Sequence, residues 1–476
     1  MKPFALKHKF ASNITRSVDD MAAFFAYKRT LSSSLELDIS LEEDNVWAVL
    51  HNTEKQWNDF VHIESSTSGE FNRAVKLAVF SVFCKLTGKK PKFPWGILTG
   101  VRPGKLVHKL LDSGMSSTRI PSYLFEKYLV PTDKGKLLTN IVLRQRKLLV
   151  PDKSLKEVGV YIGIPFCSSR CSYCSFPSGI VPSDEESQQN FLNLIEEDIH
   201  SVIQLLSMHD LHLRSLYIGG GTPTSLGEKT FARLLMLVKP LTAFTDLEEY
   251  TVEAGRPDSF SISKVAAMEV AGVNRISVNP QTFHDKTLKL IGRKHSIADF
   301  YSAYNMVRNS SIPIVNVDLI IGLPGETEEE IIYSLTQASK LRPNNLTIHT
   351  LTQKKSTSIF GKAFNLDAEA AERMVRKGRE FSASIGLEPY YLYRQHYMLG
   401  NLANVGYAYP GTESLYNIQM MEERHPIIGI GPASASKVPL ADGHHLRKLY
   451  MPKNIDTYAY SLKYLFKRRA ALFDNV

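Results

Sequence analysis

The sequence predicts an α/β protein organised around a parallel β-sheet. Between residues 158 and 351, apolar runs rich in β-branched residues alternate six times with segments of helical periodicity. A cysteine loop, a glycine-rich turn and acidic residues follow these runs, at the edge where parallel strands gather a ligand site. A mixed α+β pattern precedes the alternation, and the alternation stops after about residue 355. We therefore expect an accessory domain (1–152), a core (153–354) and a C-terminal module that covers the site (355–476).

The accessory domain is expected to contain short strands packed with helices. Its predicted strands are residues 35–39 and 46–50, and its predicted helices are 70–86 and 132–149. Cys84 lies in the apolar stripe of the first of these helices, which indicates a small core residue and not a ligand. Pro151-Asp152-Lys153 is predicted to be a linker to the core.

The core is predicted to hold six parallel strands separated by helices. The strands are residues 158–164, 213–219, 249–254, 274–278, 315–321 and 346–351. Ser183 with Glu186, and Thr327 with Glu330, have the spacing of a capping box at a helix start. Such a sheet could curve into a barrel-like wheel or remain doubly wound. In both arrangements the ligand site lies at the C-terminal ends of the strands.

The C-terminal module has a different pattern. Residues 366–384 are predicted to be helical, and residues 388–411 and 425–437 are aromatic or glycine-rich stretches typical of short strands and loops. Residues 458–473 have an amphipathic pattern, which predicts a helix docked on the core and not a membrane-surface helix.

The bulk composition excludes several classes. The 476 residues carry 57 Lys and Arg against 48 Asp and Glu, a net charge of +9 spread along the chain. This pattern favours a solvated basic surface, or attraction of an anionic ligand, and no basic-aromatic motif for nucleic acid accompanies it. No apolar run has the length of a membrane span, and the N-terminus lacks the apolar core of a signal peptide. We expect a cytoplasmic protein.

Three of the four cysteines lie on one short loop after the first core strand. Cys167, Cys171 and Cys174 have C-x3-C-x2-C spacing. Three thiolates at this spacing can hold three corners of a [4Fe-4S] cluster and leave one iron open to a small molecule. The alternatives are a zinc site or buried thiols. Structural zinc usually takes four ligands in paired spacing, and no second pair is present, so the spacing favours a cluster.

A glycine-rich turn follows the second predicted strand. The sequence GGGTPT contains Gly220, Gly221 and Thr222, and glycines here would let a ligand approach the backbone N–H groups. A tight strand-to-helix turn explains the same residues without a ligand.

Polar side chains occur near the ends of later strands. Glu253 and Asp318 could bind a ribose hydroxyl or an ammonium group, or could form an ion pair inside the sheet. Gln281 and Arg293 flank the loop after the fourth strand and could complete a polar cage, in which arginine suits a carboxylate.

Taken together, these motifs resemble those of radical S-adenosylmethionine (SAM) enzymes. YxxIPFC, GGGTPT, NRxS…Q and NxDLIxGLPG further resemble the oxygen-independent coproporphyrinogen III oxidases (dehydrogenases), over residues 158–351 and loosely through GIGPASAS. GVRPxKL in the accessory domain is similar to a longer subgroup of that family.

The resemblance implies a fold and a set of site residues. The fold is a partial (β/α)6 barrel. The three cysteines are implied as ligands of a [4Fe-4S] cluster whose open iron binds SAM, with no catalytic residue beyond the cluster and the SAM site. The implied SAM contacts are Tyr161, Gly220, Gly221, Thr222, Glu253, Gln281, Arg293 and Asp318.

The resemblance also implies a reaction and partners. A 5′-deoxyadenosyl radical would remove a β-hydrogen from a propionate of coproporphyrinogen III, and loss of CO2 and one electron would leave a vinyl group. Repetition would give protoporphyrinogen IX in haem biosynthesis. The implied partners are an anionic tetrapyrrole and a reduced flavodoxin- or ferredoxin-like donor, and Lys354, Lys355, Arg394 and His396 are candidate carboxylate contacts.

Four positions depart from the oxidase pattern. Phe176 stands where well-studied oxidases carry a further cysteine, as in relatives that resemble haem chaperones. Gly163 and Tyr416 replace histidines, and Asn279 begins Asn-Pro-Gln in place of a Gly-x-Gln pattern. The alternatives are therefore a haem-binding chaperone or trafficking protein, or another radical SAM reaction on a tetrapyrrole.

Overall fold

The computed structural model describes residues 1–10, 12–89, 91, 93–149, 155–244, 246–362, 364–440 and 445–474. The chain divides into two compact units, Met1–Thr139 and Asn140–Val476. The predicted linker Pro151-Asp152-Lys153 lies outside the described residues. Among the helices of the described ranges, none is long and apolar enough to cross a membrane.

The first unit contains a five-stranded sheet in the order β2-β1-β3-β4-β5. The strands are β1 (Lys2–Lys7), β2 (Tyr27–Thr30), β3 (Glu36–Glu42), β4 (Asn45–His51) and β5 (Gln56–His62). The helices are α1 (Ser12–Phe24), α2 (Ser68–Thr87), α3 (Gly104–Asp112) and α4 (Ile120–Tyr128), and α5 (Thr132–Gln145) begins in this unit and ends in the second. Thr67 caps the start of α2, and Gly88 ends it with a φ of 64°. Cys84 packs against the apolar core of this unit, as predicted.

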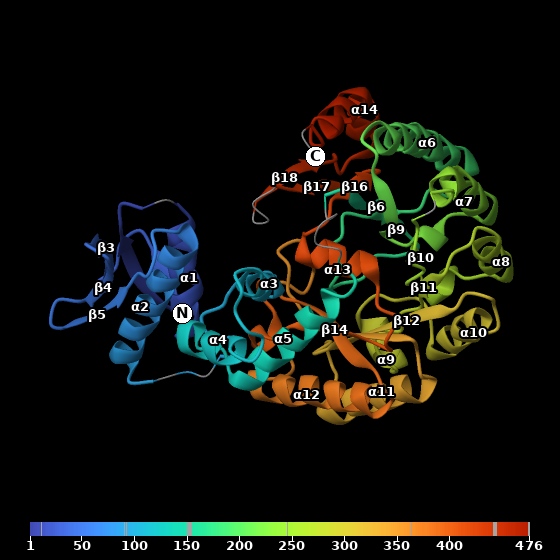
Figure 1. The fold of residues 1–476 in the computed structure, drawn as a ribbon. Helices are drawn as coiled ribbons and strands as arrows, with labels where there is room; N and C mark the ends of the chain where they lie inside the picture. Colours follow the sequence, from blue (N-terminus) through green and yellow to red (C-terminus); the bar gives the residue numbers. More distant parts are fainter. Residues whose placement is uncertain are drawn as a thin grey trace. The chain divides into compact units, whose positions relative to one another are not determined.

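The second unit contains an eleven-stranded open sheet, and its six central strands are the six that the sequence predicts. They are parallel: β6 (Glu157–Ile164), β9 (His212–Gly220), β10 (Glu249–Val252), β11 (Arg275–Ser277), β12 (Ile314–Ile321) and β13 (Asn345–Thr350). Figure 1 shows an arc of helices outside this curved sheet: α6 (Glu185–Met208), α7 (Glu228–Thr242), α8 (Ile262–Val270), α10 (Ile297–Arg308) and α11 (Glu328–Leu341). The α/β class and the barrel-like alternative are confirmed.

The two predicted helix starts have different outcomes. Thr327 and Glu330 form the predicted capping box of α11. The Ser183–Glu186 box is wrong, because α6 begins one residue later and the side chain of Asp184 accepts from the Ser187 N–H. An aspartate caps as well as a serine, and a carboxylate at this end also stabilises the helix dipole.

The C-terminal region extends the sheet at both of its edges. The antiparallel strands β15 (Asn404–Ala408) and β14 (Glu388–Tyr393) continue the sheet beyond β13. At the other edge, β16 (Ile427–Ile430) pairs in parallel with β6, and β17 (Ala435–Pro439) and β18 (Leu446–Tyr450) follow it. Three helices accompany these strands: α12 (Ala368–Ser384), α13 (Leu415–Glu422) and α14 (Ile455–Ala470). As predicted, α14 docks on the unit through buried apolar residues such as Tyr458 and Leu462.

Candidate functional site

The cysteine loop begins at the C-terminal end of β6. It is closed by the short parallel pair β7 (Phe166–Cys167) and β8 (Gly179–Ile180), and the Cys174 N–H donates to the Cys171 carbonyl at 3.2 Å. All three thiols are partly buried and form no disulfide. Burial raises the pKa of Cys174, and the neighbouring Cys171 and Cys167 add to the rise. The loop therefore brings together three thiols that can act as ligands of one iron–sulfur cluster. No three His, Cys, Asp or Glu side chains within the described ranges are placed to hold a single metal ion.

The glycine turn packs backbone against backbone beside this loop. Gly220 has a φ of 113°, and a Cβ on Gly221 would lie 2.2 Å from the Phe166 carbonyl oxygen. The Thr222 N–H donates to that same oxygen at 2.6 Å, and its hydroxyl lies 3.6 Å from the Cys167 sulfur. Only glycine fits at these two positions, so the turn forms a cradle directly next to the first cysteine.

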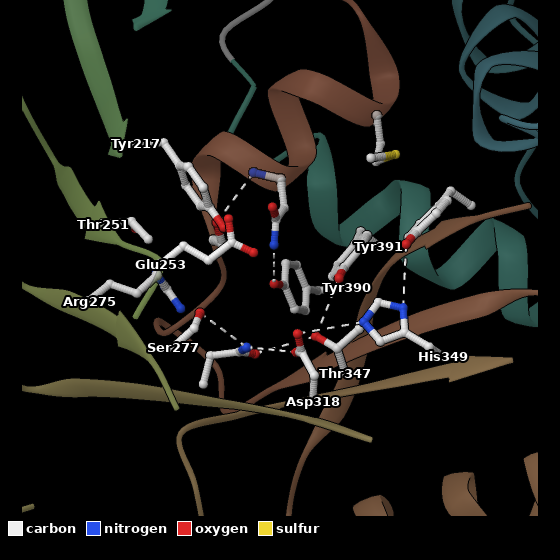
Figure 2. A pocket seen from close by; sticks show the side chains of 15 residues that line it. Tyr217, Thr251, Glu253, Arg275, Ser277, Asp318, Thr347, His349, Tyr390 and Tyr391 are labelled. Carbon is white, nitrogen blue, oxygen red and sulfur yellow. Dashed lines mark hydrogen bonds and ion pairs between the residues drawn. The ribbon is translucent and has the colours of Figure 1, made fainter. Parts of the chain in front are cut away.

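A polar cavity of about 160 Å³ lies inside the curved sheet (Figure 2). Successive inward positions on the strands supply its wall, because alternate residues of a strand face one side. Its lining includes Tyr217, Thr251, Glu253, Arg275, Ser277, Asn316, Asp318, Thr347, His349, Tyr390, Tyr391, Tyr393 and Asn417. The predicted residues Glu253 and Asp318 thus line one cavity.

The two carboxyl groups have opposite pKa shifts. Burial, with the charge of Asp318, raises the pKa of Glu253 to about 7, although the Gly220 N–H donates to its carboxylate at 3.3 Å. Burial also opposes ionisation of Asp318, but His349 together with hydrogen bonds from Asn316 and Thr347 holds the pKa of Asp318 below its ordinary value. His349 Nε2 lies 3.6 Å from the Asp318 carboxylate. Asp318 therefore offers a cationic ligand a carboxylate that is already ionised. Glu253 would be ionised more readily once such a ligand is bound beside it.

Tyr161 lies in a stack of aromatic rings beside the cavity. Its ring centroid is 6.1 Å from that of Tyr217 and 5.9 Å from that of Tyr416, and the latter two are 4.3 Å apart. The tyrosine at position 416, which departs from the oxidase pattern, therefore extends this stack, and the neighbouring Asn417 donates to the Tyr390 hydroxyl at 3.3 Å.

Gln281 and Arg293 link the cavity to the cysteine loop. The Gln281 N–H donates to the Asp318 carbonyl at 3.0 Å, and the residue has a φ of 69°. Arg293 donates to the Asn279 carbonyl at 2.7 Å and to the hydroxyl of Tyr173, between two of the cysteines, at 3.3 Å. Gln281 Oε1 and Arg293 Nε are buried without a hydrogen-bond partner among the described residues.

These features fit a [4Fe-4S] cluster with SAM. The donor set is three thiols on one loop, the glycine cradle bares backbone beside them, and two orphaned polar atoms remain for a ligand carboxylate or amine. Buried polar groups ordinarily find partners, so these two atoms are available to a polar ligand. The structure brings together the three cysteines and the eight predicted SAM contacts, and their individual roles are proposals developed below.

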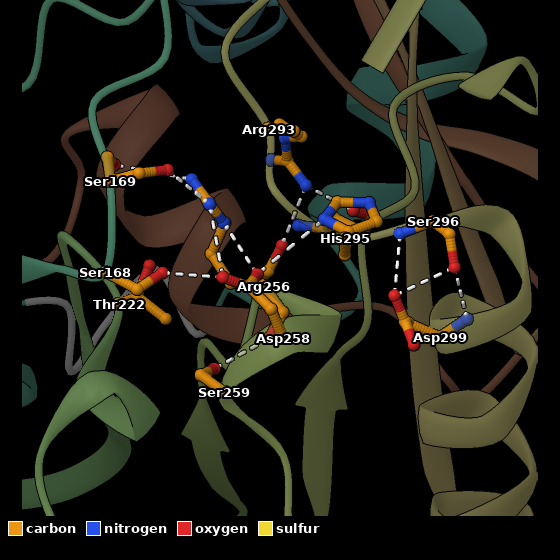
Figure 3. Close-up of polar contacts among 12 residues, drawn as sticks. Ser168, Ser169, Thr222, Arg256, Asp258, Ser259, Arg293, His295, Ser296 and Asp299 are labelled. Atoms are coloured by element: carbon orange, nitrogen blue, oxygen red, sulfur yellow. Dashed lines mark hydrogen bonds and ion pairs between the residues drawn. The ribbon is translucent and has the colours of Figure 1, made fainter. Parts of the chain in front are cut away.

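Sequence reasoning missed Arg256 and His349. Arg256 follows β10 and reaches the cysteine loop at Ser169 (Figure 3). Its Nη1 lies 3.3 Å from the Cys171 sulfur. His349 is an inward residue near the end of the sixth strand, so the alternation of that strand could have identified it. No comparable signal marks Arg256, because it lies in a turn.

One candidate substrate contact has a different role. Arg394 is buried and donates to the carbonyls of Leu402 and Asn401, so it holds a loop together. Lys354 is partly buried, and burial lowers its pKa, whereas Lys355 is exposed.

Comparison with known proteins finds relatives named as coproporphyrinogen III oxidases, as oxidase-like proteins and as heme chaperones. Residues 161–338 match the Radical SAM superfamily. The chain is 39% identical over 402 residues to the oxygen-independent coproporphyrinogen-III oxidase-like protein HemZ of Bacillus subtilis, a match that spans 82% of this chain and 80% of HemZ. It is 29% identical to the heme chaperone HemW of Escherichia coli, over 62% of this chain and 73% of HemW. The fold is similar to that of the coproporphyrinogen III oxidase HemN from Escherichia coli, with a TM-score of 0.52 and 19% identity over 68% of this chain and 73% of that one.

Proposed function

Because the chain belongs to the radical SAM superfamily, and within it to the family of oxygen-independent coproporphyrinogen-III oxidase-like proteins, we propose that it decarboxylates propionate side chains of coproporphyrinogen III. The product would be protoporphyrinogen IX. A reduced flavodoxin- or ferredoxin-like protein would supply one electron for each SAM cleaved, and a one-electron acceptor would take up the electron released with each CO2. The observation that carries the proposal is the three-thiol loop beside a glycine cradle and two orphaned polar atoms.

Cys167, Cys171 and Cys174 would hold the cluster, and Gly220 to Thr222 would face the amino-acid part of SAM. The bound pair supplies one-electron cleavage of a sulfonium bond, which yields a carbon radical able to remove a hydrogen atom. Metal-bound cysteines are thiolates, so the raised pKa of Cys174 predicts that cluster assembly releases a proton there.

The side chains around the cradle would fix the orientation of SAM. Arg293 suits a carboxylate because its guanidinium forms a planar fork, and its Nε remains unpartnered among the described residues. Glu253 would pair with an ammonium group, which favours its ionised form. Asp318 accepts from Asn279 and Asn316 at 2.8 Å each, so its carboxylate is held in one orientation for a hydroxyl.

An anionic substrate is supported by unpaired cations around the cysteine loop. The Ser172 N–H donates to the Ile291 carbonyl, and the Ser358 hydroxyl donates to the Ser172 carbonyl, so three segments meet here. Their exposed cations form no ion pair within the described ranges: Arg170, Lys289, Lys294, Lys355 and Lys362. Coproporphyrinogen III carries four carboxylates, which these five exposed cations would attract.

A second candidate is haem carriage, and Phe176 is the observation that favours it. Its ring lies 3.2 Å from the position a Cβ of Gly220 would take, so an apolar side chain packs on the cradle where the oxidases carry a further cysteine. The relative HemW is a heme chaperone.

One anaerobic experiment distinguishes these candidates. The reconstituted protein is incubated with SAM, dithionite and coproporphyrinogen III, and products are analysed by mass spectrometry, with Cys171→Ala as the inactive control. The proposal predicts a mono-vinyl intermediate and then protoporphyrinogen IX. Absence of vinyl products together with stoichiometric haem binding would replace the proposal with the carrier function.

A further inference from the structure

A buried arginine contacts one of the three predicted cluster ligands. Arg256 is 3% exposed and follows β10, at the N-terminal end of the 3-10 turn Pro257–Ser259. Its Nη1 lies 3.3 Å from the sulfur of Cys171. A neutral thiol is a weak acceptor, whereas a metal-bound thiolate carries negative charge and accepts strongly from a guanidinium. The contact therefore has its full strength only when Cys171 is a ligand.

The remaining donors of Arg256 hold the guanidinium in place. Nε and Nη2 form a fork on the carboxylate of Asp258, at 3.0 and 3.3 Å. Nη2 also donates to the Ser169 hydroxyl at 2.6 Å, and the Ser168 hydroxyl donates to Asp258 at 2.7 Å (Figure 3). Hydrogen bonds thus join the cysteine loop to the turn after β10, and they orient Nη1 toward the sulfur.

The carboxylate that pairs with Arg256 is ionised. Burial alone would favour the neutral acid, but His295, Arg256 and Ser168 together hold the pKa of Asp258 far below its ordinary value. The His295 ring lies 3.7 Å from Asp258, and burial lowers the pKa of His295, so the imidazole adds no charge near neutral pH. The arginine therefore remains a cation paired with one carboxylate beside the sulfur.

We propose that Arg256 is a positioning residue that donates a hydrogen bond to the Cys171 thiolate and thereby raises the reduction potential of the cluster. Reduction adds negative charge to the cluster and its sulfurs, and a buried donor on one sulfur stabilises that charge. Replacement of the arginine removes the donor and leaves the Asp258 carboxylate nearby without its arginine partner. Both changes disfavour reduction, so they act in the same direction.

The test is a redox titration of the full-length, reconstituted protein, followed by electron paramagnetic resonance. It rests on the cluster of the proposed function, so iron and sulfide are first measured in the wild type. Wild-type protein without a [4Fe-4S] signal would refute the proposed site itself, whereas a normal wild-type signal leaves the role of Arg256 to the variants.

Two variants and a matched control decide the role of Arg256. Arg256→Met is expected to lower the equilibrium constant for one-electron reduction at least tenfold, which is about 59 mV. Arg256→Lys, which keeps the charge and loses the fork, is expected to show a smaller fall in the same direction. The control Arg373→Met removes an exposed arginine that pairs with Glu328 at 2.7 Å, and it should leave the potential unchanged.

Two outcomes would overturn the inference. Loaded Met and Lys variants with the wild-type potential would show that the contact does not affect the cluster. Folded Met and Lys variants that bind no iron would assign Arg256 a purely structural role in the loop. A fall in potential with wild-type iron content supports the inference, because a merely structural residue would not change that potential.

Discussion

Glu253 makes the stability of the protein depend on pH near neutrality. Its carboxyl group lies at the end of β10 beside the cavity, where burial and the nearby Asp318 raise its pKa from 4.5 to about 7. Glu253→Gln has nearly the same shape and cannot ionise, so it removes this dependence and keeps the packing. The variant therefore isolates the electrostatic cost of keeping this carboxylate buried beside Asp318.

The sign and size follow from proton linkage. Below pH 4.5 the group is protonated in both the folded and the unfolded protein, so it contributes nothing. Between pH 4.5 and 7 the unfolded chain ionises while the folded protein does not, and the stability of the folded state falls as pH rises. Above pH 7 the folded state is destabilised by the full amount. A pKa raised from 4.5 to about 7 corresponds to about 3 kcal/mol, because each pKa unit is about 1.4 kcal/mol.

Urea unfolding of the apoprotein, followed by circular dichroism, measures this effect. At pH 8.5 Glu253→Gln should be more stable than the wild type by about 3 kcal/mol, and near pH 4.5 the two should be equal. Glu197→Gln, an exposed carboxyl on α6, is the matched control and should give no such difference. Parallel pH profiles for the wild type and Glu253→Gln would refute the electrostatic reasoning.

Two further substitutions test the packing around the site. Gly221→Ala places a Cβ 2.2 Å from the Phe166 carbonyl, so it should cost about 1–3 kcal/mol and reduce iron binding on reconstitution, whereas Gly179→Ala has open space and should match the wild type. Wild-type iron content in Gly221→Ala would show that the cradle tolerates a side chain. Arg469→Met removes the cationic partner of the buried Asp198 carboxylate, which Arg469 contacts at 2.5 Å, and should cost about 3–5 kcal/mol, with the exposed Arg468→Met as control. Equal thermal midpoints for these last two variants would contradict a buried ion pair at α14.

The central sheet could be predicted from the sequence because its signals are local. The parallel strands are short runs rich in buried apolar residues, and the helices between the strands have their own caps and periodicity. The cysteine spacing, the glycine turn and the strand-end acids are likewise short motifs. Parallel strands bring such motifs to one edge, so the predicted residues could be expected to meet there.

The remaining features depend on contacts between distant segments. The strand β16 pairs with β6 across more than 250 residues of chain, and no local pattern specifies that pairing. Arg256 lies in a turn, and only the folded structure shows that it reaches Cys171. The raised pKa of Glu253 arises from burial and from Asp318 on another strand, so it too follows from the fold.

The most direct test of the proposed reaction is isotope transfer from substrate to SAM product. Coproporphyrinogen III deuterated at the propionate β-carbons is incubated anaerobically with the reconstituted protein, SAM and dithionite, and the 5′-deoxyadenosine is analysed by mass spectrometry. The proposal predicts one deuterium in each 5′-deoxyadenosine and one vinyl group for each SAM cleaved. Unlabelled 5′-deoxyadenosine, formed without vinyl product and at the same rate when the tetrapyrrole is omitted, would contradict it.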